Sequence, residues 1–142
     1  MNNAFWPKVT NITLKRAAGT ATEAQSEIQL DAFQFKKEGN GEYSNIIIDG
    51  YKNQTTPTAK NGGAIQILDL TTYNNQVVAG KIKLTNVTIT NTDNLFISGA
   101  STFTVAAGSF LPTTNWATST TATGAALTNG AWSTVNGATL IK

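Results

Sequence analysis

The chain contains no cysteine and no histidine, and only 13% of its residues are charged. Without cysteine, disulfides and thiolate metal sites are both excluded. Without histidine, the chain lacks the commonest general base, the commonest metal ligand and any Ser-His-Asp arrangement. No Ser-x-x-Lys motif offers another nucleophile. These absences predict a non-enzymatic protein with no catalytic residues, no cofactor and no metal.

The acidic residues are few but could still form a catalytic pair. Glycoside hydrolysis needs two carboxylates about 5–10 Å apart, and eight acidic residues are present. They are scattered along the sequence, and several stand beside lysine or in predicted turns, as solvated charges do. Residues 91–94 supply oxygen ligands but a single carboxylate, which is few for calcium. We therefore expect the acids on a wet surface and keep a paired-acid hydrolase as the least favoured alternative.

Long apolar runs and a concentration of charge of one sign are missing as well. No segment has the unbroken apolar length that crosses a bilayer. The N-terminus has no basic region followed by an apolar one, so it does not resemble a secretory signal. A net charge of +2 is too small to indicate a nucleic-acid partner. The sequence therefore predicts no membrane partner, no direct contact with nucleic acid and no export by a standard signal.

Thr, Asn, Ser and Gly take the place of the missing charge and favour strands and turns over long helices. Alternation of apolar and polar residues predicts strands at 9–15, 43–49, 64–70, 76–79, 81–90, 95–98 and 102–106. The stretch 23–37 also fits a capped helix, but its alternation favours a strand with a bulge near Ala32-Phe33. Within 81–90 the apolar positions change from even to odd numbers, which requires a bulge or turn at Thr85-Asn86. The Asn-Gly pairs at 129–130 and 136–137 predict tight hairpins.

This series of short strands and turns predicts the fold class. About eight to ten strands at such spacing are typical of an all-β domain. We therefore expect a single antiparallel β-sandwich or barrel, of jelly-roll or immunoglobulin-like kind, with little or no helix. Residues 9–142 would form this domain, and residues 1–8 would be an N-terminal extension that serves as a docking arm.

Two parts of the chain are candidates for partner binding, the N-terminal extension and the uncharged C-terminal region. The N-terminal extension carries aromatic side chains ahead of the first predicted strand, and residues 94–141 contain no charged side chain at all. Interface cores are depleted in charge and enriched in aromatic residues, although core packing is the default for an aromatic. The residues expected to contact a partner are Phe5, Trp6, Pro7, Trp116 and Trp132.

The run 84–92 represents the texture of the whole chain, a Thr/Asn/Gly-rich β-module without Cys or His. In this texture the sequence resembles accessory structural proteins of tailed bacteriophages, namely capsid decoration or auxiliary proteins and small tail or fibre components. The resemblance implies a virion protein that binds the major capsid protein or copies of itself, as a homo-oligomer or bound to a lattice, and stabilises the particle. No family site residue is transferred, because the resemblance lies in texture across the chain.

A bacterial surface adhesin or carbohydrate-binding module, located at the cell surface, is the alternative from another class. Residues 44–50 and 84–90 resemble rungs of the right-handed parallel β-helices found in such proteins. A β-helix needs many rungs of regular length, and the spacings here are irregular. We therefore expect the sandwich or barrel. Aromatic side chains exposed in a row on one sheet would favour the adhesin.

Overall fold

The computed structural model describes residues 6–16, 31–53, 62–99, 104, 116–126, 134–135 and 138–139. A four-stranded sheet contains, in this order, β1 (Lys8–Lys15), β3 (Gly41–Asp49), β5 (Ile82–Thr90) and β7 (Trp116–Thr118). A three-stranded sheet contains β2 (Asp31–Phe35), β4 (Gly63–Ile67) and β6 (Asn94–Ser98). The other elements are α1 (Leu70–Thr72), the π-helical turn η1 (Tyr73–Val77), and the pair β8 (Thr134–Val135) and β9 (Ala138–Thr139).

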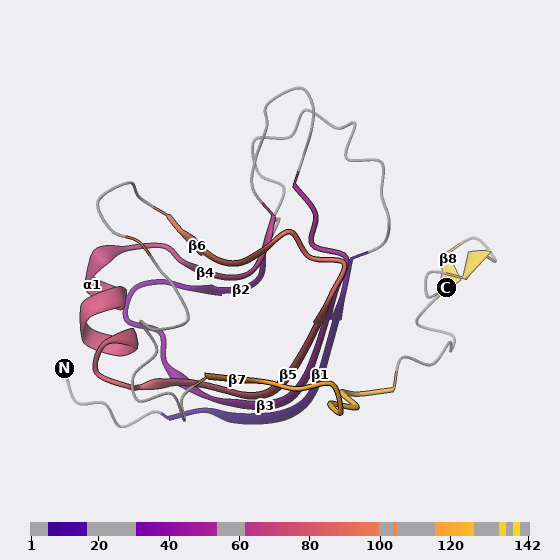
Figure 1. The fold of residues 1–142 in the computed structure, drawn as a ribbon, viewed down its shortest axis with the longest axis horizontal. Coiled ribbons are helices and arrows are strands. Elements are labelled where there is room, and N and C mark those ends of the chain that lie inside the picture. The colour runs from indigo at the N-terminus through magenta and orange to yellow at the C-terminus, as the bar shows by residue number, and fades with distance from the viewer. Residues whose placement is uncertain are drawn as a thin grey trace.

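All neighbours in the two larger sheets pair in parallel, so the predicted antiparallel sandwich or barrel is wrong. Consecutive strands alternate between the sheets, and the chain therefore winds in coils. The first coil is β1 and β2, the second β3 and β4, the third β5 and β6, and β7 begins a fourth. Figure 1 shows the first sheet bending at one side and the second sheet closing the coil above it. Parallel sheets are typical of α/β folds, but here each crossover contains a strand of the opposite sheet.

Two physical reasons explain why the sequence misled us about strand direction. Side chains alternate with period two in parallel and antiparallel strands alike. The outer face of each coil is solvated, so these parallel strands show the in–out alternation that usually marks antiparallel sheets. Equivalent residues of neighbouring coils are 34 and then 41 positions apart. The unequal spacing arises in the segments that connect the strands, whereas the strands themselves stack in register. Irregular spacing along the sequence was therefore no argument against parallel rungs.

A short repeat marks the corner at which the first sheet bends. An apolar residue, Ser or Thr, Asn and a second apolar residue recur in β1, β3 and β5. The three asparagines of this repeat, Asn11, Asn45 and Asn86, have φ values of 59°, 54° and 53°. Asparagine tolerates this left-handed conformation better than most residues. The turn predicted at Thr85-Asn86 is thus confirmed, and it is a corner that every coil repeats.

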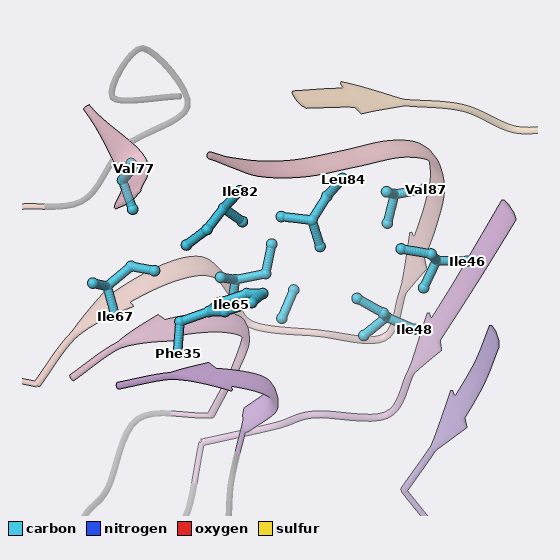
Figure 2. Packing of buried hydrophobic residues seen from close by; sticks show 10 residues of the cluster. Phe35, Ile46, Ile48, Ile65, Ile67, Val77, Ile82, Leu84 and Val87 are labelled. Carbon is cyan, nitrogen blue, oxygen red and sulfur yellow. The ribbon is translucent and has the colours of Figure 1, made fainter. Parts of the chain in front are cut away.

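The apolar core is deepest in the middle of the stack. Figure 2 shows its side chains converging from both sheets and from η1. The fully or almost fully buried apolar residues are Phe35, Ile46, Ile48, Ala64, Ile65, Ile67, Val77, Ile82, Leu84 and Val87. In the first coil, Ile12 is only partly buried and Val9 is 45% exposed. Burial therefore comes chiefly from the second and third coils.

The helical segment closes one side of the coil between β4 and β5 (Figure 1). Asp69 caps it, since its carboxylate accepts hydrogen bonds from the Thr72 backbone N–H at 2.8 Å and from the Lys37 backbone N–H at 3.0 Å. Gln76 and Val77 are buried in this segment. The strand predicted at 76–79 is therefore wrong, because a short apolar run does not distinguish a strand from a buried helical turn.

The positions of most other strands were predicted correctly. The segments 9–15, 43–49, 64–70, 81–90 and 95–98 correspond to β1, β3, β4, β5 and β6. β2 lies within 23–37, but it pairs with β4 in one continuous register, so the bulge predicted there is wrong. β8 and β9 pair as an antiparallel hairpin across positions 136–137, as the Asn-Gly pair predicted. The strand predicted at 102–106, apart from residue 104, and the hairpin predicted at 129–130 lie outside the described residues.

Candidate binding groove

Charged side chains on the outside of the first sheet form a ladder across the coils. Lys8, Glu42 and Lys83 occupy one register position on β1, β3 and β5. The Glu42 carboxylate lies 3.3 Å from the Lys8 Nζ and 3.1 Å from the Lys83 Nζ. The hydrogen bond from Lys83 is the largest cause that lowers the pKa of Glu42, and bonds from Trp6 and Lys8 add to it. This carboxylate is held as an anion that links neighbouring strands.

The carboxylates of two further acids, Asp49 and Asp93, are also held by hydrogen bonds. A hydrogen bond from the Asn91 side chain is the main cause that lowers the pKa of Asp49. The backbone N–H of Asn53, 2.7 Å away, is the main cause that lowers the pKa of Asp93. Lowered pKa values suit structural anions and do not suit a general acid. Among the described residues, no group of three or more Asp or Glu could hold a metal ion.

Asp31 is the buried acid among the described residues. It begins β2, is 6% exposed and stands in register with Gly63 of β4. Burial raises the pKa of Asp31 from 3.8 to about 6, and a hydrogen bond from the Gly63 backbone opposes this shift. The next register position, on β6, is Asn94, an amide. A second carboxylate, which a glycosidase-like pair requires, does not stand in this register column.

The corner asparagines form a second ladder. The Asn45 Nδ2 donates to the Asn11 Oδ1 at 2.7 Å, and the Asn86 Nδ2 donates to the Asn45 Oδ1 at 3.3 Å. Stacked amides of this kind satisfy one another from coil to coil. The sequence analysis missed this ladder. The threefold recurrence of Ser or Thr before Asn, flanked by apolar residues, is the signal that could have found it.

A strap, residues 119–126, crosses the outside of this corner. Its first contact is with the third coil, where the Ser119 backbone N–H donates to the Val87 carbonyl at 2.8 Å. The Thr123 backbone N–H then donates to the Asn45 Oδ1 at 2.7 Å, on the second coil. Finally the Thr13 Oγ1 donates to the Ala125 carbonyl at 2.6 Å, on the first coil. The strap thus ties all three coils together (Figure 1).

An open groove of about 630 Å³ lies where the strap leaves the stack. Its floor comes from the second half of β5, the following corner and β6, namely Val87, Ile89, Asn91, Thr92 and Leu95, and one wall is formed by residues 118–120. We call this feature the end groove. It lies at the C-terminal end of the stack, since β6 ends the order of the described strands in its sheet. Its volume falls in the usual range of ligand sites.

The two ends of the stack differ in charge. β1 ends the first sheet at the N-terminal end, where Lys8 and Lys15 stand on the strand and Arg16 follows it. Charged residues on an edge strand discourage pairing with another chain. The described residues that line the end groove are all uncharged. The C-terminal end is therefore the better surface for protein contact.

The residues predicted to bind a partner are not gathered in one place. Trp6 and Pro7 are half-buried against the start of β3, where the Glu42 backbone N–H donates to the Pro7 carbonyl at 2.8 Å. A Cβ at Gly41 would lie 2.7 Å from the Pro7 ring, so glycine is required for this close approach. The backbone of Trp116 pairs with Leu84 on β5. Phe5 and Trp132 lie outside the described residues, and partner binding by these five residues stays a prediction.

Comparison with protein-family models, curated proteins and solved structures finds no match for this chain. In the part of the chain that the structure describes, no helix is long and apolar enough to cross a bilayer.

Proposed function

We propose that this chain is a non-enzymatic structural protein that docks on another subunit of a larger particle through the C-terminal end of its coil stack. The observation that carries the proposal is the difference between the ends, because lysines stand on the N-terminal edge strand and the end groove is uncharged. The particle is a virion, the setting that the sequence texture implies. The partner is the major capsid protein or a further copy of the chain.

The arrangement of the acids supports a structural role. Glu42, Asp49 and Asp93 each hold a neighbouring strand or loop, and hydrogen bonds lower the pKa of each. A chain that uses its carboxylates as fixed anions has few left for acid–base chemistry. The strap and the asparagine ladder add further links between coils, as suits a module that bears load inside an assembly.

The proposal is tested on particles purified from the source cells by density gradient. Quantitative mass spectrometry should find the chain in the particle fraction at a fixed ratio to the main shell protein. An abundant soluble protein of the same cells serves as the control for trapped material. Absence from the particle fraction, or a ratio that varies with the washing steps, would overturn the proposal.

An adhesin or carbohydrate-binding module is the second candidate, and the parallel stacking of β3 on β5 favours it. These strands contain the two segments that resemble rungs of such proteins. The aromatic side chains weigh against it. Phe33, Phe35 and Tyr43 pack against one another, with ring centroids 5.5 to 6.1 Å apart, and do not form a row on an outer face. Saturable binding to a glycan array, together with absence from particles, would favour this candidate.

A further inference from the structure

The end groove has the features of a site for an extended chain. We infer that it takes an uncharged peptide strand of a partner subunit, which pairs with β5 beyond the point where β7 ends. This inference rests on the proposed function and names the chemistry by which the stack docks.

Strand β5 is paired unequally along its length. From Leu84 to Val87 it lies between β3 and β7, and the register with β7 ends at the pair Val87 and Thr118. Beyond this point the chain turns into the strap, and the Ser119 carbonyl accepts from the Thr88 side chain at 2.8 Å. From Thr88 to Thr90, β5 pairs with β3 on one side and with none of the other described strands. The end groove lies along this segment.

An added strand fits this position for two reasons. Backbone N–H and C=O groups need hydrogen-bond partners, and strand addition supplies them along a sheet edge. The side chains of an extended peptide point alternately to the two faces, so every second one would reach the apolar floor at Ile89 and Leu95. Among the lining residues that the structure describes, there is no aromatic side chain on which a sugar ring could stack. A peptide is therefore favoured over a carbohydrate.

The lining also selects an uncharged peptide. Its described polar members are Asn, Thr and Ser, and the described part of the lining offers no lysine, arginine or carboxylate. A charged side chain brought against this surface would lose water without gaining an opposite charge. Uncharged Thr- and Asn-rich strands, such as those of this chain itself, fit the lining without that cost.

The test uses a capped peptide that copies residues 87–92, an uncharged segment formed by the end of β5 and the two residues that follow it. The matched control copies residues 12–17, which align with 87–92 in the first coil and carry Lys15 and Arg16. In an NMR titration of the full chain, the first peptide should shift the amide signals of Thr88, Ile89 and Leu95 saturably and leave β1 unchanged. The charged peptide should bind about tenfold more weakly or not at all. Unsaturated or uniform shifts would overturn the inference.

Two variants distinguish peptide binding at the end groove from binding at the other end of the stack. Leu95 lies in the groove, Val9 lies on β1, and both are 45% exposed. Leu95→Lys should weaken peptide binding about tenfold, whereas Val9→Lys should leave it within about twofold of the parent. Thermal unfolding confirms that both variants fold. Equal effects of the two variants on binding would overturn the inference.

A third probe tests strand pairing directly. The peptide of residues 87–92 with an N-methyl group on every residue has no residue N–H to donate to a sheet edge, and it should not bind. Equal binding of the methylated peptide would overturn strand addition. The outcome is separable from that of the proposed function. If the chain is found in particles but the peptide does not bind, only the inference about the end groove is refuted. If the peptide binds but the chain is not associated with particles, only the particle role is refuted.

Discussion

Asp31 differs from the exposed acids in the sign of its contribution to stability. Burial raises the pKa of Asp31 to about 6, whereas hydrogen bonds lower the pKa of Asp49 and Asp93. Asp31 in the native state keeps its proton up to about pH 6, and in the unfolded chain it loses the proton near pH 3.8. The contribution of Asp31 to the free energy of unfolding is therefore fully present below about pH 4 and is lost as the pH rises to 6.

Replacing Asp31 with Asn should make the protein more stable at neutral pH. A shift of this size corresponds to a free energy of unfolding on the order of 2–3 kcal/mol. We expect Asp31→Asn to gain up to that amount at pH 7 and little at pH 4, as measured by urea unfolding at several pH values. Asp93→Asn is the control of opposite sign, with a loss at pH 7 that disappears in acid. A gain from Asp31→Asn that is the same at every pH would contradict this account.

Asn45 combines two properties that variants can separate. It adopts φ 54°, and its carboxamide bonds to Asn11, Asn86 and Thr123. Asn45→Gly keeps the backbone conformation and removes the amide, so it should cost roughly 1–3 kcal/mol. Asn45→Ala adds the left-handed penalty of about 1 kcal/mol. Chemical unfolding of both variants measures the difference, and equal costs would show that the corner does not require the positive φ.

The strap is an element without regular secondary structure, yet it contacts every coil. Gly124 has φ 57°, and a Cβ there would collide with the Thr13 hydroxyl and lie 2.9 Å from the Ile12 carbonyl. Gly124→Ala should therefore lift the strap from the first coil, with a cost of about 1–2 kcal/mol. Hydrogen exchange at Thr123 should rise in Gly124→Ala. It should not change in Ala126→Ser, an exposed control on the same strap. Unchanged exchange in both variants would show that the strap does not depend on this contact.

The positions of the strands were easier to predict from the sequence than the pairing of each strand with its neighbours in the sheet. The alternation of residues located five strands, because solvated outer faces leave a clear period of two. Strand direction and pairing depend on which segments meet when they lie 31 to 41 positions apart in the sequence, and no local pattern reports that distance. The Asn repeat of β1, β3 and β5 did carry this information. Only its third occurrence, at Thr85-Asn86, was interpreted, as a bulge or a turn.

The end groove could not be predicted from the sequence for the same reason. The end groove joins β5, β6 and residues 118–120, and these segments become neighbours only through the winding of the chain. The uncharged character of residues 94–141 was visible in the sequence, and part of that stretch lines the groove. Of the aromatic residues selected as docking anchors, Trp6 is the one whose side chain the structure describes, and it does not line the groove. Aromatic content alone could not separate residues that pack within the chain, such as Trp6, from residues at a surface.

At the scale of the whole molecule, the stack resembles a repeat protein whose outer coils are less buried than its middle. Stability in such a stack is approximately a sum over coils and the interfaces between them. Ile12 and Ile46 make this testable, since they occupy one register column on β1 and β3. Ile46 is fully buried and Ile12 partly buried. Removing the same atoms from the two positions therefore compares the coils directly.

We expect Ile46→Ala to lower the free energy of unfolding by about 2–5 kcal/mol, the range for a buried isoleucine. Ile12→Ala should cost less than half of that, because its side chain already contacts water and leaves a smaller cavity. Denaturant unfolding of the isolated chain measures both values, and native-state hydrogen exchange should show β3 and β5 opening last. If Ile12→Ala costs as much as Ile46→Ala, the first coil must be covered in solution by protein that contacts β1. The N-terminal end would then be an interface as well, and the assignment of docking to the uncharged end alone would have to be abandoned.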